Sequence, residues 1–197
     1  MADKVVALFV EGQTEIEFYK AVIKKTRELM NTPFCCKIEY IDMKGIGNYK
    51  NDALRKFNHL KEEYCDKDIY VFLCIDLDVF GLSKKPPFDR KKLPLLLEES
   101  GAKKVTYIIA KQSIEDWFLH DFSGVINYLH LPTNTKRPKG SGQEALKSLF
   151  KKGNKLYVKG GKTEGFIERL NITNIIKAYC SSLKPLCQIL NLDCKKI

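Results

Sequence analysis

The stretch YVFLCIDLDVFG, residues 70–81, is an apolar run that ends abruptly at Asp76 and Asp78. Such a run, rich in β-branched and aromatic residues, is typical of a central parallel strand buried on both faces. Side chains two residues apart on a strand point to the same side, so the two aspartates are predicted to converge on one cation at its carboxyl end. Carboxylates of this kind suit Mg²⁺ or Mn²⁺. The alternative interpretation is a turn or helix cap after a buried strand.

Carboxylates also follow the first predicted strand. The apolar run 5–10 leads into Glu11 and Gly12, and Gly12 would let the backbone turn sharply. A helix is predicted to begin at Thr14, which is a plausible cap. Glu15 then lies in the first turn, where the helix dipole favours acidic side chains. Dipole compensation explains Glu15 without any catalytic role, but Glu11 precedes the helix and stands at the strand end as Asp76 does.

A third acidic cluster follows the predicted strand 104–111, which ends at Lys111. Ser113 is expected to cap a short helix that contains Glu115. This glutamate has a purely structural interpretation, as a first-turn acid. Because the carboxyl ends of parallel strands meet at one edge of a sheet, the three clusters are nevertheless expected to lie together. Carboxylates gathered there must be neutralised by metal or by basic side chains.

The alternation of strands and helices predicts an α/β fold with a mostly parallel sheet of about four strands flanked by helices. Residues 1–122 are predicted to form this domain, and 123–197 a basic loop and helical extension that packs on it. The predicted strands are 5–10, 37–43, 70–75 and 104–111, and the predicted helices begin at 14 and cover 52–64, 93–100 and 166–192.

The charge of the chain favours polyanionic partners. Lys and Arg number 34 against 24 acidic residues, which gives a net charge of +10 over 197 residues. Nucleic acid is the first expected partner and an acidic membrane the second, although a solvated basic surface would give the same composition. No apolar run is long enough to span a bilayer and the start lacks a signal-peptide layout, so a cytoplasmic protein is expected. The seven cysteines are expected to be reduced packing residues, with a zinc site at Cys180, Cys187 and Cys194 as the alternative.

Two stretches after residue 130 are rich in Lys, Gly and Pro. They contain lysines interleaved with one aromatic side chain, which could form a track for phosphates with Tyr157 stacked on a base. The alternative is a solvated loop. The predicted nucleic-acid-binding residues are Lys136, Arg137, Lys139, Lys155, Tyr157, Lys159 and Lys162.

The motifs EGQTE at 11–15 and DLDVFG at 76–81, each after an apolar strand, resemble the TOPRIM domain of topoisomerases, bacterial primases and OLD-family nucleases. The segment SIEDWFL at 113–119 and the lysine-rich region around Tyr157 are similar to small, stand-alone bacterial TOPRIM-like proteins, some of which belong to phage-defence systems. The chain has no room for the additional domains of topoisomerases or primases. It also lacks the ATPase domain of OLD nucleases, so any regulation by ATP would come from a partner protein.

The resemblance implies a metal-dependent nuclease acting on DNA or RNA. Glu11 would be a metal ligand or general base, and Asp76 and Asp78 would bind metal. Glu15 and Glu115 resemble the acids that bind a second metal in OLD nucleases, and Lys111 could neutralise a phosphate oxygen. Two alternatives remain open at this stage. One is a non-catalytic module that binds nucleic acid or regulates a partner, and the other is an enzyme of phosphotransfer or nucleotide hydrolysis.

Overall fold

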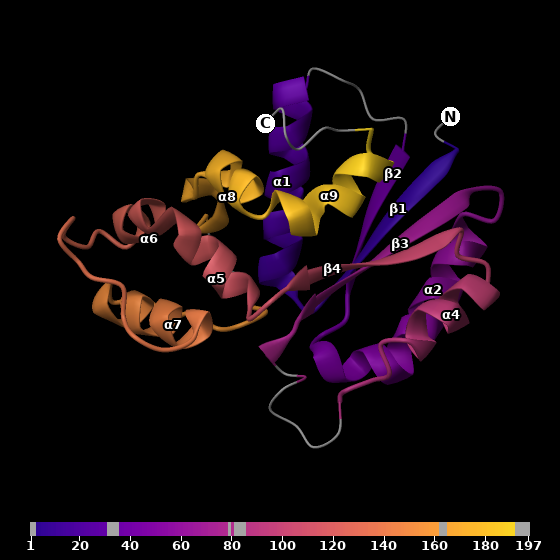
Figure 1. Ribbon diagram of the computed structural model, residues 1–197, viewed down its shortest axis with the longest axis horizontal. Helices are drawn as coiled ribbons and strands as arrows, with labels where there is room; N and C mark the ends of the chain where they lie inside the picture. Colours follow the sequence, from indigo (N-terminus) through magenta and orange to yellow (C-terminus); the bar gives the residue numbers. More distant parts are fainter. Residues whose placement is uncertain (1–2, 31–35, 79, 81–85, 162–164, 192–197) are drawn as a thin grey trace.

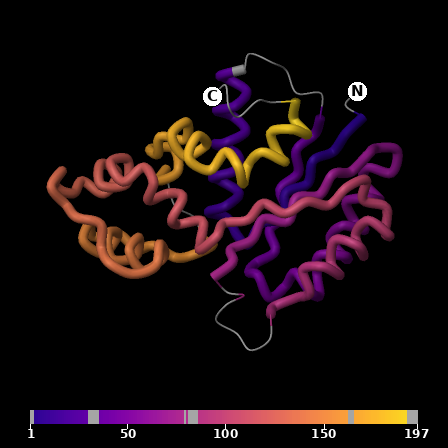
Figure 2. Tube along the Cα trace, in the orientation of Figure 1, coloured from indigo at the N-terminus to yellow at the C-terminus, as the bar shows by residue number. Residues whose placement is uncertain are grey.

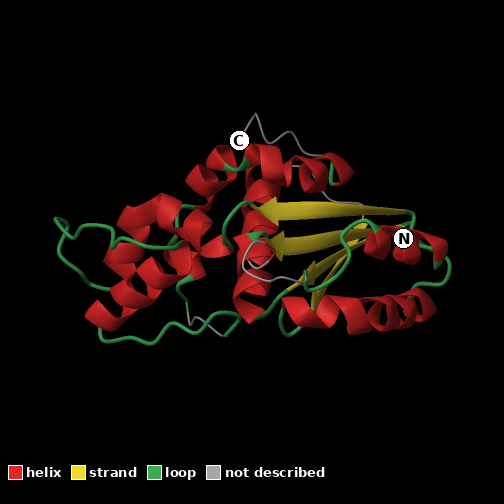
Figure 3. Cartoon of the chain, turned by 60° about the horizontal axis from the view of Figure 1, so that its bottom comes forward, coloured by secondary structure: helices red, strands yellow, loops and turns green. Residues whose placement is uncertain are grey.

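A computed structural model describes residues 3–30, 36–78, 80, 86–161 and 165–191. In these ranges a four-stranded parallel sheet has helices on both faces (Figure 1, Figure 3). The elements, in chain order, are β1 Lys4–Val10, α1 Gln13–Met30, β2 Cys36–Asp42, the 3₁₀ helix η1 Ile46–Asn48, α2 Tyr49–Glu63, β3 Asp68–Asp76, α4 Lys92–Glu99, β4 Lys104–Ala110, α5 Ile114–Phe118, η2 Leu119–Asp121, α6 Phe122–Tyr128, α7 Gly142–Lys152, η3 Ile167–Arg169, α8 Ile172–Ala178 and α9 Cys180–Ile189.

The strand order is β2-β1-β3-β4, and every neighbouring pair is parallel, which confirms the predicted parallel sheet. β1 and β3 are the central strands and hydrogen-bond to each other. The carboxyl ends of all four strands therefore lie at one edge. Helices α5, α6 and α7 stand beyond this edge (Figure 1).

Alternate residues of β1 pack on opposite faces of the sheet. Leu8 and Val10 belong to a core that includes Phe18 of α1. Ala7 belongs to a second core, which includes Phe57 of α2. The period of two along a strand produces this division, and it explains why a strand buried on both faces reads as a continuous apolar run. Full burial of a side chain such as phenylalanine contributes about 1.5–3 kcal/mol.

The described part of residues 123–197 shares the first of these cores. Phe150 of α7, Ile175 of α8 and Leu183 of α9 are all buried there. Helix α8 contacts α1, and α9 contacts β4. Figure 2 shows the yellow C-terminal end of the tube beside the indigo first helix, although the two are distant in sequence.

The structure corrects three local predictions. The basic tract is not a continuous loop, because it contains α7, whose capping box joins Ser141 and Glu144. The helix predicted over 166–192 is divided into η3, α8 and α9. Thr14 lies within α1 rather than at its cap, and its hydroxyl donates to the carbonyl of Gly161 at 2.6 Å.

Within the described ranges, no helix is both long and apolar enough to cross a bilayer. Cys180 and Cys187 lie on α9 and are not in a disulfide, whereas Cys194, the third member of the alternative zinc site, lies outside the described residues.

Candidate metal centre

Three carboxylates meet at the carboxyl edge of the sheet. Glu11 follows β1 and Asp76 ends β3, so the pairing of these central strands places them side by side. Glu15 reaches the same point from the first turn of α1. One oxygen of each side chain lies within 4.8 Å of the others. Glu11 is 8% exposed, Glu15 is 5% exposed and Asp76 is 1% exposed. We call Glu11, Glu15 and Asp76 the acidic cluster.

Backbone N–H groups hold these carboxylates in place. The Glu11 N–H donates to Oε2 of Glu15 at 2.8 Å, and the Asp76 N–H lies 3.4 Å from Oε1 of Glu11. The N–H of Ile114, at the start of α5, donates to Oδ1 of Asp76 at 2.9 Å. The turns after β1, β3 and β4 are therefore joined through the carboxylates, which fixes their orientation before any ligand binds.

Glu115 adds a fourth carboxylate from α5. Its side chain is completely buried, and its Oε1 accepts a hydrogen bond from the Tyr157 hydroxyl at 2.9 Å. Its Oε2 is the single buried side-chain oxygen or nitrogen without a hydrogen-bond partner in the described part of the chain. A buried carboxylate oxygen without a hydrogen-bond partner destabilises the fold, so a cation, a proton or a water molecule is expected beside it.

Burial raises the pKa of every member of the acidic cluster. The pKa of Asp76 rises to about 7, because desolvation outweighs the attraction of Lys159. The pKa of Glu11 is raised by burial, and that of Glu15 is raised well above its ordinary value by burial and by the charge of Glu11. The charge of Glu115 adds to the shifts of Glu11 and Asp76. The ionised form of the cluster is therefore disfavoured in the metal-free protein, and either a proton or a bound cation relieves this cost.

Lys159 supplies the positive charge that the protein itself provides. Its ammonium lies 2.7 Å from Oδ2 of Asp76 and 3.8 Å from Oε2 of Glu11. Burial opposes the charge of Lys159, but the carboxylates of Asp76 and Glu11 outweigh it and raise the lysine pKa. One ammonium against several carboxylates leaves the site acidic.

The segment 157–161 crosses the turn between β1 and α1 and closes the site. The Gln13 N–H donates to the Gly160 carbonyl at 2.9 Å. A Cβ atom on Gly12 would lie 2.7 Å from the Cα of Gly160, so the two backbones approach too closely for any other residue at position 12. The extension after residue 122 therefore forms one wall of the acidic site.

Two other predicted site residues, Asp78 and Lys111, are not members of the acidic cluster. β3 ends at Asp76, so the strand alternation does not extend to Asp78, whose N–H donates to the Gln112 carbonyl at 3.2 Å. Asp78 is half-buried, and its charge still adds to the raised pKa of Glu11. Lys111 is exposed after the end of β4, and no hydrogen bond or ion pair within the described ranges joins it to the acidic cluster.

The predicted nucleic-acid track also changes. Tyr157 is 3% exposed and bonded to Glu115, so it cannot stack on a base, and Lys159 points into the cluster instead of along a surface. Leu156 and Val158 are 84% and 54% exposed, so the segment alternates like a strand between outward apolar side chains and inward functional ones.

The remaining basic residues of that track lie on the surface. Lys136, Lys139 and Lys155 are exposed, whereas Arg137 pairs with Asp116 at 2.8 Å. The ammonium of Lys155 lies 4.7 Å from the centre of the Tyr128 ring. Lys162 lies outside the described residues.

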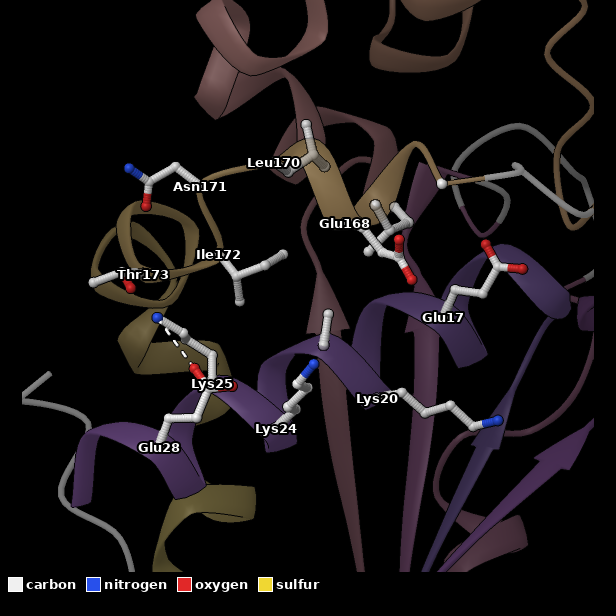
Figure 4. Close-up of a pocket in the computed structure, with 13 residues that line it drawn as sticks. Glu17, Lys20, Lys24, Lys25, Glu28, Glu168, Leu170, Asn171, Ile172 and Thr173 are labelled. Carbon is white, nitrogen blue, oxygen red and sulfur yellow. Dashed lines mark hydrogen bonds and ion pairs between the residues drawn. The ribbon is translucent and has the colours of Figure 1, made fainter. Parts of the chain in front are cut away.

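Two hollows are relevant to ligand binding. The acidic site opens into one of about 420 Å³, which Gly45 and Lys44 also line. A larger hollow of about 880 Å³ lies between α1 and the η3–α8 region (Figure 4). Its charged side chains balance, because three lysines face three glutamates, so it favours no class of charged ligand. The lysines are Lys20, Lys24 and Lys25, and the glutamates are Glu17, Glu28 and Glu168.

Comparisons of the chain with family models, curated proteins and solved structures found no match. Its function is therefore inferred from the geometry and chemistry of the site.

Proposed function

We propose that this protein is a TOPRIM-type phosphodiesterase that cleaves nucleic acid with the help of a divalent cation. The observation that supports this most strongly is the acidic cluster itself. Carboxylates from two adjacent strand ends and one helix converge within 4.8 Å, beside the unpartnered Oε2 of Glu115. Clusters of perturbed carboxylates in a cleft at a sheet edge are typical of functional sites.

The donor set fits Mg²⁺ or Mn²⁺, because both prefer carboxylate oxygens. Glu11, Glu15 and Asp76 would hold the ion. A bound divalent cation would stabilise the negative charge that develops on a phosphodiester during hydrolysis. The three carboxylates are already oriented by backbone N–H groups, so little reorganisation is needed when the ion binds.

Lys159 and Glu11 have roles in the same reaction. Once a divalent ion neutralises the carboxylates, the ammonium of Lys159 is free to contact a phosphate oxygen, which it can do as a point charge on a flexible stem. Glu11 would contribute as a ligand, and the cation would balance the carboxylate charge that burial disfavours in the metal-free protein.

A cleavage assay tests the proposal. Wild-type protein is incubated with single-stranded and duplex DNA and RNA in Mn²⁺ or Mg²⁺, and compared with Asp76→Asn and Glu17→Gln. Asn retains the acceptor for the Ile114 N–H, so Asp76→Asn should fold and lose cleavage by about 100-fold or more. Glu17 lies on α1 outside the cluster, and Glu17→Gln should cleave as wild type does. Cleavage by folded Asp76→Asn at the wild-type rate would refute the proposal.

One observation favours a second candidate, a nucleic-acid-binding module without catalysis. The ammonium of Lys159 lies 2.7 Å from Asp76, and in such a module it would replace the metal permanently. This candidate predicts salt-sensitive nucleic-acid binding that neither Mg²⁺ nor the loss of Asp78 alters. The phosphodiesterase predicts metal binding that raises the stability of the fold.

A further inference from the structure

A basic groove with an aromatic wall lies near the acidic site, and its cations are not among the nucleic-acid-binding residues that the sequence predicted. Its volume is about 820 Å³. The cations that line it are Lys50 at the start of α2 and Arg90, Lys91 and Lys92 before and at the start of α4. We call it the Phe80 groove, after the half-buried ring that forms part of its wall.

The groove has a net positive charge. Among the described residues that line it, Asp89 is the single acidic one, against four cations. The Asp89 carboxylate is already engaged, because its Oδ1 accepts the N–H groups of Lys91 at 2.8 Å and Lys92 at 3.1 Å. These hydrogen bonds lower the Asp89 pKa, so it stays ionised and anchors the start of α4. Lys50 and Arg90 are exposed and available to a ligand.

The aromatic wall consists of packed rings and has a cation over it. The Arg90 guanidinium lies 4.9 Å from the centre of the Phe80 ring. Phe80 packs edge-to-face on Phe88 at 5.4 Å, and Phe88 stacks on Tyr49 at 5.4 Å. A nucleobase that stacks on this face takes the place of the Arg90 guanidinium, which the exposed side chain then offers to phosphate.

The same aromatic series ties the groove to the acidic edge of the sheet. The Tyr49 hydroxyl oxygen lies 2.8 Å from the carbonyl oxygen of Phe9 and 2.7 Å from that of Cys74, which share its one proton, and each of these residues precedes a member of the acidic cluster by two positions. Phe80 follows Asp76 by four residues, so their Cα atoms are at most about 14 Å apart. A few nucleotides of a single strand span that distance.

We propose that the Phe80 groove binds the backbone of a single-stranded nucleic acid and leads it into the acidic site. The inference deepens the proposed phosphodiesterase function by naming its substrate as single-stranded. A single strand fits better than a duplex, because only an unstacked base can lie on Phe80. The positive charge supplies the phosphate contacts, and the aromatic ring supplies the preference for an unpaired strand.

The test measures binding by fluorescence anisotropy in EDTA, so that no cleavage occurs and failure of the catalytic proposal does not affect the result. Labelled oligo-dT and oligo-U of equal length separate DNA from RNA, and a hairpin duplex serves as the paired probe. The variants are Arg90→Gln with Lys91→Gln, Phe80→Leu, and a charge-matched control, Lys20→Gln with Lys24→Gln, in the larger hollow.

The groove double variant should bind a single strand about tenfold more weakly, and its plot of log affinity against log salt should be shallower by about 1.4. Phe80→Leu should weaken single-strand binding by roughly 5- to 150-fold, the effect of losing one stacked base, and should leave duplex binding unchanged. The control double variant should match wild type.

Three outcomes would overturn the proposal. Equal weakening by the groove and control variants would show that binding depends on overall charge. Unchanged single-strand binding by Phe80→Leu would show that no base stacks on the ring. Wild-type oligonucleotide binding by the groove double variant, with lost binding to anionic phosphatidylserine vesicles, would assign the groove to a membrane surface.

Discussion

Replacing Asp76 by Asn should stabilise the metal-free protein at alkaline pH, although it removes a central residue of the site. Burial raises the pKa of Asp76 to about 7 from its ordinary value of 3.8. A carboxyl group with a raised pKa contributes stability that is complete below pH 4 and is lost as the pH rises through 7. Asn does not titrate, so the variant keeps the folding stability that the wild type loses as the pH rises.

The size of the effect follows from these two pKa values. Over the whole titration, a difference of about 3 pKa units corresponds to about 4 kcal/mol, and about 2.6 kcal/mol of this falls between pH 5 and pH 8. The buried neighbours Glu11 and Glu15 titrate together with Asp76, so we expect the variant to gain about 1–3 kcal/mol relative to wild type over this range. The attraction between Lys159 and the ionised Asp76 is already contained in the pKa of about 7, so it adds no separate contribution to this range.

The assay is urea denaturation in EDTA at several pH values, followed by the fluorescence of Trp117. This is the only tryptophan in the chain, and it is 2% exposed in the folded protein. Glu17→Gln serves as the control and should follow the wild-type pH dependence. Adding Mn²⁺ at pH 8 should stabilise wild type and leave Asp76→Asn unchanged. Parallel pH profiles for wild type and Asp76→Asn in EDTA would refute the reasoning.

Three further predictions concern the segment around the site and α7. Gly12→Ala should destabilise the fold by about 1–3 kcal/mol in urea denaturation and weaken Mn²⁺ binding, because its Cβ would lie 2.7 Å from the Gly160 Cα; wild-type values would show that 157–161 moves freely. Tyr157→Phe should lower the free energy of unfolding by about 1–3 kcal/mol, because Glu115 loses its hydrogen bond, and an unchanged thermal midpoint would contradict this. Ser141→Ala should cost about 1 kcal/mol through loss of the α7 cap, with Mn²⁺ binding unchanged by calorimetry; altered Mn²⁺ binding would show that α7 is coupled to the site.

The sequence predicted the sheet and part of the site because both depend on local rules. Apolar runs and the crossover rule determine a parallel sheet, and a parallel sheet brings the ends of its strands to one edge. Glu11 and Asp76 meet for this reason, and Glu15 follows because the first turn of α1 begins there.

Other features depend on tertiary contacts that no local pattern specifies. Whether Asp78 shares the face of Asp76 depends on the residue at which β3 ends, and an apolar run does not specify that residue. The positions of Tyr157 and Lys159 depend on how the segment 157–161 packs against the turn between β1 and α1. The contact between Thr14 and Gly161 there joins residues 147 positions apart in the sequence. In contrast, α7 was predictable, because Ser141 and Glu144 have the spacing of a capping box within an otherwise basic tract.

The measurement that tests the central claim most directly is a calorimetric titration of Mn²⁺ into metal-free protein at pH 8. Wild type is compared with Glu15→Gln and with its matched control Glu17→Gln, two residues further along α1. A divalent-cation site at the acidic cluster predicts binding by wild type and Glu17→Gln, and its loss in folded Glu15→Gln. Absence of binding by folded wild type at millimolar Mn²⁺, or equal binding by Glu15→Gln, would contradict the assignment.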